Sequence, residues 1–292
     1  MTTRKIKNIC FAGGGFYGFA QIGVLKELEK YQEHLQIEDI RGVSVGSIVA
    51  AMYAVGYTAD ELLQIMMKLN FDELIKDNGL VIIKLYEKYG MYDALRLEIE
   101  IENLLRSKTH IKFCTFSQIR KNLTIISTNL NKQCPVFFNR DTSPDLPISK
   151  AIRMSIGYPL IMTPVVHEGD FYGDGGEFIN YPITTLPDTE LAVTIGITFA
   201  TIHENDNGTL KKRFEISNLY DYIAAIAYTL SRANYVSQVT EKYLERSIIV
   251  HITDDINSMS FRLTEQQKIF LYECGIKAVN EQIQRILGLA AS

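Results

Sequence analysis

The pentapeptide Gly42-Val43-Ser44-Val45-Gly46 is the part of the chain that restricts its fold most. It joins an apolar run to an alanine-rich run, which predict a strand over 37–43 and a buried helix over 45–55. A serine between a strand and a helix lies on a very tight turn, so glycines are needed two positions on either side. That turn exposes the serine Oγ at the tip of a sheet, beside the positive end of the following helix. The pattern predicts a nucleophilic Ser44, and a serine that only caps the helix is the alternative.

The elements predicted around this turn alternate between strand and helix, as in an α/β fold. Residues 5–12 predict a first strand, glycines interrupt the chain, and residues 17–31 predict a helix. Strands alternating with helices are typical of a mostly parallel sheet with helices on both faces. Further strands are predicted at 123–130, 136–139, 191–199 and 247–252, and further helices at 59–69, 94–106, 146–156, 218–244 and 264–287. Residues 71–92 predict either helices or a flap.

Bulk composition excludes several classes of protein. The chain has 292 residues, no repeat and no linker rich in Pro, Gly and Ser, so a single domain over 1–292 is expected. A net charge of −4 without a basic cluster argues against a nucleic-acid partner. The four cysteines are dispersed and form no CxxC pair, which predicts reduced thiols and no metal site. Neither uncharged run, 8–25 or 42–59, reads as a signal peptide or a spanning helix, so we expect a cytoplasmic or peripheral membrane protein.

A glycine-rich loop, Gly13 to Gly18, follows the predicted first strand. Backbone amides of Gly13, Gly14 and Gly15 can surround an anionic oxygen, and beside a serine nucleophile they would form an oxyanion hole. The same residues also satisfy G-x-G-x-x-G, the dinucleotide fingerprint, with an acidic residue (Glu38 or Asp39) about where a ribose ligand is expected. A nucleotide-binding protein is therefore a second reading of this loop.

Asp174-Gly175-Gly176 is the third motif, and it supplies an acid. An Asp-Gly pair is a common hairpin turn. A carboxylate close to the Ser44 hydroxyl could instead take its proton during attack on an ester, and burial would make that carboxylate a better base.

Histidine is the more usual base beside a nucleophilic serine. In an α/β-hydrolase the histidine follows the acid late in the chain, so His203 and His251 are the candidates. His203 lies in a polar stretch that predicts a loop, and His251 lies at the end of a predicted strand.

The three motifs in this order and spacing resemble the patatin-like phospholipase family. The resemblance covers about 6–196 and extends more loosely to the C-terminal helices and strand over 218–290. Shorter similar segments lie between the motifs, namely Gly90-Met91-Tyr92-Asp93, Ser127-Thr128-Asn129, Ala151-Ile152-Arg153-Met154-Ser155 and Asn180-Tyr181-Pro182.

The resemblance implies a three-layer α/β/α fold and a Ser–Asp dyad that needs no histidine, metal or cofactor. Ser44 would be acylated, Asp174 would be the base, and Gly14 and Gly15 especially would hold the oxyanion. The family usually has arginine where this chain has Tyr17, so any contribution of that arginine to loop stiffness or head-group binding is missing here.

The function expected from the resemblance is hydrolysis of fatty acyl esters in phospholipids or related lipids, of the phospholipase A or lysophospholipase type. A non-catalytic lipid-binding member is the remaining alternative. Lipid substrates imply peripheral membrane contact, and the segment 71–92 is a candidate for the entrance. Its apolar residues are Leu80, Val81, Ile82, Ile83 and Leu85. Head-group preference and oligomeric state do not follow from the sequence.

Overall fold

The structure, a computed structural model, describes residues 5–75, 81–201, 215–252, 256 and 262–289. Its centre is an eight-stranded sheet that contains β1 (Ile6–Phe11), β2 (Leu35–Val43), β4 (Asn122–Asn129), β5 (Cys134–Phe138), β7 (Val165–His167), β8 (Asp170–Asp174), β9 (Thr194–Thr201) and β10 (Ser247–Ile252). The order is β10-β9-β1-β2-β4-β8-β7, and β5 pairs with β4. The first five strands of this order are parallel, whereas β5 and β8 run antiparallel to β4. The predicted mostly parallel sheet is confirmed.

The described helices are α1 (Gly18–Leu28), α2 (Val45–Ala54), α3 (Ala59–Lys68), α4 (Phe71–Ile75), α5 (Val81–Lys88), α6 (Leu95–Thr109), α7 (Ile148–Ser155), α8 (Asp188–Leu191), α9 (Leu219–Gln238), α10 (Glu241–Leu244) and α11 (Glu265–Leu287). Short 3-10 helices include η1 (Gly15–Tyr17), η4 (Gly175–Glu177) and η5 (Pro182–Thr185). Two further strands, β3 (Gly90–Tyr92) and β6 (Leu160–Met162), pair in a separate small sheet.

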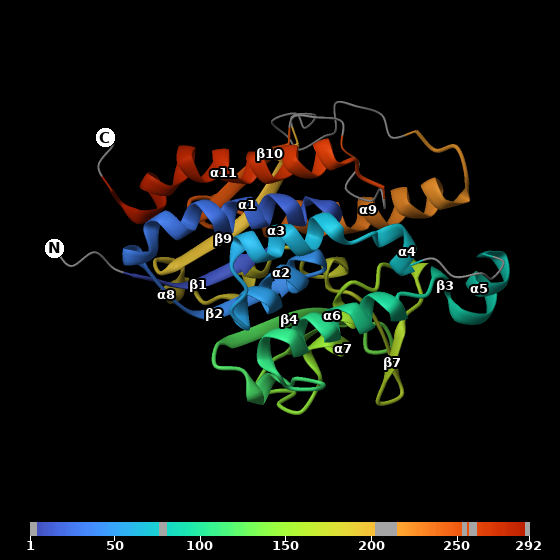
Figure 1. The fold of residues 1–292 in the computed structure, drawn as a ribbon. Helices are drawn as coiled ribbons and strands as arrows, with labels where there is room; N and C mark the ends of the chain where they lie inside the picture. The colour runs from blue at the N-terminus through green and yellow to red at the C-terminus, as the bar shows by residue number, and fades with distance from the viewer. Residues whose placement is uncertain (1–4, 76–80, 202–214, 253–255, 257–261, 290–292) are drawn as a thin grey trace.

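Helices cover both faces of the central sheet, which gives three layers. Ile9 and Phe11 of β1 pack into the larger apolar core with α1, α2 and α11. Their neighbour Cys10 belongs to a second core on the opposite face, with Tyr181 and Leu191. Alternate residues of a strand point to opposite faces, so β1 is buried on both sides. Figure 1 shows α1, α3 and α11 lying together along one face of the sheet.

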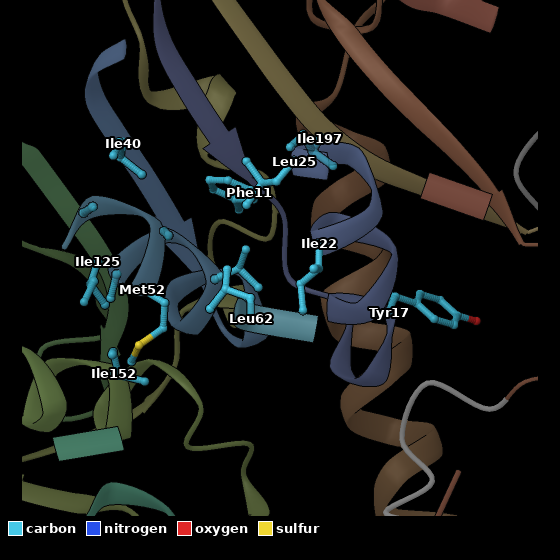
Figure 2. Packing of buried hydrophobic residues seen from close by; sticks show 14 of the residues in the cluster. Phe11, Tyr17, Ile22, Leu25, Ile40, Met52, Leu62, Ile125, Ile152 and Ile197 are labelled. Atoms are coloured by element: carbon cyan, nitrogen blue, oxygen red, sulfur yellow. The ribbon is translucent and has the colours of Figure 1, made fainter. Parts of the chain in front are cut away.

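The larger core continues from the sheet into the helices that surround the end of β2. Figure 2 shows Met52 of α2 directed toward Ile152 of α7, and both side chains are fully buried. Burying a side chain of this size contributes about 1.5–3 kcal/mol relative to exposure, so this contact holds α2 and α7 together around the predicted serine turn.

Three predicted elements differ from the structure. The helix expected over 17–31 ends as α1 at Leu28 and is followed by the 3-10 helix η2 (Glu29–His34). The helix expected over 218–244 is broken into α9 and α10, because Val239 and Thr240 have extended backbone angles. The strand expected over 191–199 begins at Thr194, because the preceding residues form α8. The segment 71–92, left open between helices and a flap, contains α4, α5 and β3, while residues 76–80 lie outside the described ranges. Within those ranges no helix combines the length and apolar content needed to cross a bilayer.

Candidate active site

Strand β4 brings the end of β2 and the end of β8 to one point. Along β4, Ile126 pairs with Val43, the last residue of β2, and the next residue, Ser127, pairs with Asp174, the last residue of β8. Residues 125–129 of β4 pair with β5 along one edge of β4. Strands β2 and β8 therefore both pair with the other edge of β4, where β8 follows directly after β2. The chain leaves β2 at Ser44, so this register places Ser44 beside Asp174.

The turn at Ser44 has the tight geometry that its sequence predicts. Ser44 adopts φ 53° and ψ −133°, a backbone conformation that is unusual for a residue with a side chain. A Cβ atom on Gly42 would lie 2.4 Å from the carbonyl oxygen of Gly46. A Cβ atom on Gly46 would lie 2.5 Å from the carbonyl oxygen of Phe11. Only glycine fits at either position, as expected from the pentapeptide.

The hydroxyl of Ser44 is hydrogen-bonded to the carboxylate of Asp174. Ser44 Oγ donates to Asp174 Oδ2 at 2.7 Å, and the amide of Gly176 donates to Asp174 Oδ1 at 2.7 Å. Asp174 is only 2% exposed. Burial raises the pKa of Asp174 to about 6, although the hydrogen bonds from Ser44 and Gly176 act in the opposite direction. The Asp-Gly pair forms no hairpin turn, because it starts the 3-10 helix η4.

A second serine holds the backbone of the turn. The amide of Ser44 donates to Ser155 Oγ at 2.9 Å, and Ser155 Oγ donates to the carbonyl oxygen of Ile126 at 2.5 Å. Ser155 is fully buried at the end of α7. Its hydroxyl therefore ties the strained turn to β4, the strand that also fixes Asp174. In the sequence, Ser155 lies in a segment that resembles the family, but no local pattern indicates its role.

The glycine-rich loop lies against the same serine. A Cβ atom on Gly13 would lie 3.2 Å from Cβ of Ser44 and 2.2 Å from Oδ1 of Asn180. The amide of Gly13 donates to the carbonyl oxygen of Asn180 at 2.9 Å, so it is already occupied. Over the described ranges, the amides of Gly14 and Gly15 donate to no acceptor. These two amides are available for a ligand beside Ser44.

Tyr17 braces this loop where the family resemblance predicts arginine. The Tyr17 side chain is 9% exposed, and its hydroxyl donates to the carbonyl oxygen of Ile256 at 3.1 Å. Its ring packs on Phe199 at a centroid distance of 5.2 Å, and a Cβ atom on Gly14 would touch that same Phe199 ring. An aromatic contact and a hydrogen bond thus hold the loop without a guanidinium group.

A cavity of about 150 Å³ opens onto Ser44. Its polar end is formed by Gly14, Gly15, Ser44, Asp174 and Asn180. Away from this end its lining is mostly apolar and comprises Phe16, Val45, Ile48, Met66, Phe71, Leu97, Ile156, Ile161 and Met162, with Tyr158 and Tyr228. A cavity with a few polar groups at Ser44 and an otherwise mostly apolar lining suits a ligand with an ester group and a hydrocarbon tail.

A second acid, Glu177, lies close to Asp174, and no motif in the sequence points to it. Burial, and then the charge of Asp174, raise the pKa of Glu177 to about 8. Its Oε1 atom is buried and is bonded to no described donor. Glu177 therefore favours its protonated form more than an exposed glutamate does, and the negative charge of the pair lies mainly on Asp174.

The described residues do not support the alternatives of a histidine base, a nucleotide site or a metal site. His203 lies outside the described ranges. His251 is exposed on β10, and none of the described histidines lines the cavity. A ribose-binding acid would be expected at the end of β2, but Asp39 pairs with Asn8 well before that end, where Ser44 lies instead. Among the described residues, no group of three or more His, Cys, Asp and Glu side chains could hold a metal ion.

Sequence comparisons relate the chain to two viral proteins. Protein R571 of Acanthamoeba polyphaga mimivirus is 55% identical over 284 residues, which are 97% of this chain and 95% of that protein. The probable lipid hydrolase 463L of Invertebrate iridescent virus 6 is 26% identical over 183 residues, which are 61% of this chain and 62% of that protein.

Solved structures share the fold at low identity. VipD of Legionella pneumophila matches with a TM-score of 0.56 and 15% identity, over 97% of this chain and 67% of that chain. ExoU of Pseudomonas aeruginosa, in its complex with SpcU, also gives a TM-score of 0.56 and 15% identity, over 98% of this chain and 53% of that chain. The chain therefore spans about half the length of ExoU. At these identities the likeness shows the fold.

The family comparison covers more than half of the chain and includes all three motifs. The patatin-like phospholipase model matches residues 9–187, from the first strand to beyond the Asp-Gly-Gly segment. The chain belongs to the patatin-like phospholipase family.

Proposed function

We propose that the chain hydrolyses fatty acyl esters of phospholipids, as a phospholipase A or a lysophospholipase. Membership of the patatin-like phospholipase family and the likeness to a probable lipid hydrolase support a lipid hydrolase. The observation that carries the mechanism is the 2.7 Å contact between Ser44 Oγ and Asp174 Oδ2 beside the glycine loop.

In the first step Ser44 Oγ attacks the ester carbonyl carbon while its proton passes to Asp174. A buried carboxylate with a pKa of about 6 is ionised at neutral pH and is a stronger base than an exposed one. The tetrahedral intermediate collapses to an acyl-enzyme, and Asp174 returns the proton to the departing alcohol oxygen. In the second step Asp174 deprotonates water, which attacks the acyl carbon, and Ser44 Oγ leaves with a proton from Asp174 as the fatty acid is released.

The negative oxygen of each intermediate would be held by the amides of Gly14 and Gly15. Losing one such donor typically costs about 3 kcal/mol of barrier stabilisation. Gly13, which the sequence grouped with them, would serve instead by fixing the loop, because its amide donates to Asn180.

Peripheral membrane contact would supply the substrate, because a lipid must leave a bilayer to reach the cavity. The outer face of α9 carries Leu219, Tyr222, Ile226 and Leu230, which are 54%, 53%, 46% and 60% exposed. Their spacing places them on one stripe of the helix without a charged residue, which is unusual for a face in water. Tyr228, on the opposite side of the same helix, lines the cavity. We propose that this stripe rests on the lipid surface.

The segment 71–92 is a second candidate for the surface that contacts the membrane. Phe71 of α4 lines the cavity, and Ile83 of α5 is 48% exposed, whereas Leu85 is partly buried. Leu80 and the side chains of Val81 and Ile82 lie outside the described part of the chain.

Product analysis tests the function. The purified chain is incubated with mixed phospholipids, and the products are identified by mass spectrometry, with Ser44→Ala as control. We expect the wild type alone to release free fatty acids, with lysophospholipids as the second product of a phospholipase A and glycerophosphodiesters as the second product of a lysophospholipase. Release of phosphate or head groups, or equal products from Ser44→Ala, would refute the proposal.

A further inference from the structure

A second cavity lies behind the inner wall of the cavity at Ser44. It has a volume of about 20 Å³, room for about one water-sized group. Four residues line both cavities, namely Ile48, Met66, Phe71 and Leu97. These four side chains, from α2, α3, α4 and α6, therefore form a partition between the two spaces. The inner cavity continues among α2, α3 and α6, next to Met52 and Leu62 of the larger core shown in Figure 2.

The partition stands where a hydrocarbon tail would end. The outer cavity is polar at Ser44 and Asp174 and mostly apolar elsewhere, and the partition forms part of that apolar lining, so a tail whose ester group lies at Ser44 can reach it. Of the four side chains, Met66 is unbranched and adaptable, whereas Ile48 is β-branched and stiff. Met66 is also 7% exposed, so its side chain occupies the interior.

We propose that Met66, with the other three partition residues, sets the length of the acyl chain that the enzyme accepts. This inference rests on the proposed function, since it concerns the acyl group transferred to Ser44. Short and medium tails fit in the outer cavity, and longer tails are stopped at Met66. Shortening residue 66 joins the two cavities and admits more of the tail. Each further methylene buried raises kcat/KM by up to about fourfold.

The test compares two matched methionine variants. Met66→Ala opens the partition, whereas Met52→Ala removes the same atoms from a residue that lines only the inner cavity. The rates of both variants and the wild type are measured on p-nitrophenyl esters with saturated chains of increasing length. We expect Met66→Ala to shift the preferred chain length upward and Met52→Ala to keep the wild-type preference. A Met66→Ala profile that overlays the wild type, or an equal shift in Met52→Ala, would overturn the proposal.

Two measures keep this test independent of folding and of catalysis. The ratio of rates on long and short esters does not depend on the folded fraction, and Met66→Val is a milder variant if Met66→Ala does not fold. Displacement of a fluorescent fatty acid by saturated fatty acids of increasing length measures the same preference without turnover. Lack of turnover by the wild type would refute the proposed function. An unchanged binding preference in the Met66 variants would refute the role of the partition.

Discussion

The Oγ atom of Ser44 lies 2.7 Å from Oδ2 of Asp174, although 130 positions separate the two residues. Neighbouring residues of β4, Ile126 and Ser127, pair with the ends of the two strands that carry them. The contact between Ser44 and Asp174 is thus fixed by the register of one strand rather than by a flexible loop, which suits the proposed role of the two residues as a catalytic dyad.

Removing either member of the dyad is expected to abolish ester hydrolysis. Ser44→Ala removes the nucleophile, and Asp174→Asn removes the group that accepts its proton, so each variant should lose about ten-thousandfold in kcat or more. Rates on a short-chain ester measure the loss, and circular dichroism checks the fold. Full activity in Asp174→Asn would exclude the Ser–Asp mechanism.

The pH profile should report the ionisation of Asp174. The pKa of Asp174 is raised to about 6, and only the ionised form can accept a proton. We expect kcat/KM to rise with pH through about 6 and to level off above it. Glu177→Gln should leave this acidic limb unchanged, because Glu177, with its pKa raised to about 8, is already protonated there. A profile that is flat from pH 5 to pH 8 would contradict the assignment.

Stability should depend on pH through the same carboxyl group. A raised folded-state pKa means that Asp174 contributes stability below about pH 4 and that this contribution is lost as pH rises through about 6. The side chain introduced by Asp174→Asn is uncharged at every pH, so the variant does not lose stability as pH rises through about 6. Urea unfolding should show the variant more stable than the wild type at pH 8, by up to about 3 kcal/mol, and the gap should close near pH 4. The same difference at both pH values would rule out this linkage.

Ser155 is expected to act as a positioning residue. Ser155→Ala breaks the link between the Ser44 amide and Ile126, so kcat should fall about 10–100-fold while KM changes little. Ser149→Ala is the matched control, because Ser149 is equally buried on α7 but donates to Glu102, away from the dyad. Both variants should lose similar stability. An equal loss of kcat in the two would show that the role of Ser155 is structural only.

The proposed contact of the α9 stripe with a lipid surface can be tested by introducing charged residues into the stripe. The triple variant Leu219→Asp, Ile226→Asp and Leu230→Asp should weaken binding to phosphatidylcholine liposomes by more than about tenfold, because carboxylates are costly to bring into a lipid surface. Phe113→Asp changes another exposed apolar residue, 54% exposed, that does not line the cavity. Sedimentation with liposomes measures the binding of the α9 triple variant and of Phe113→Asp. Equal binding by these two variants would show that α9 is not part of the membrane-contacting surface.

Local patterns predicted those parts of the site that depend on neighbours in sequence. The glycines around Ser44 are needed because backbone atoms pass within 2.5 Å of where their Cβ atoms would lie, and a G-x-S-x-G between a strand and a helix indicates such crowding. The pairing with Asp174 followed only from the resemblance to a family, because the register of β4 leaves no periodic signal in the sequence.

Long-range contacts explain what the sequence missed. The amide of Gly13 is occupied by Asn180, and the ring of Tyr17 packs on Phe199, contacts that join distant segments of the chain. The break between α9 and α10 was also missed, because Val239 and Thr240 are only mildly unfavourable in a helix and give a weak local signal.

Labelling with a fluorophosphonate probe tests the reactivity of Ser44 most directly. The probe reacts with a serine that is activated by a base beside an oxyanion hole. Peptide mapping by mass spectrometry should find the adduct on Ser44 in the wild type, in a protein that also hydrolyses a short-chain ester, and no adduct in Asp174→Asn. Ester hydrolysis by a wild type that carries no adduct on Ser44, or undiminished labelling of Asp174→Asn, would contradict the proposed dyad.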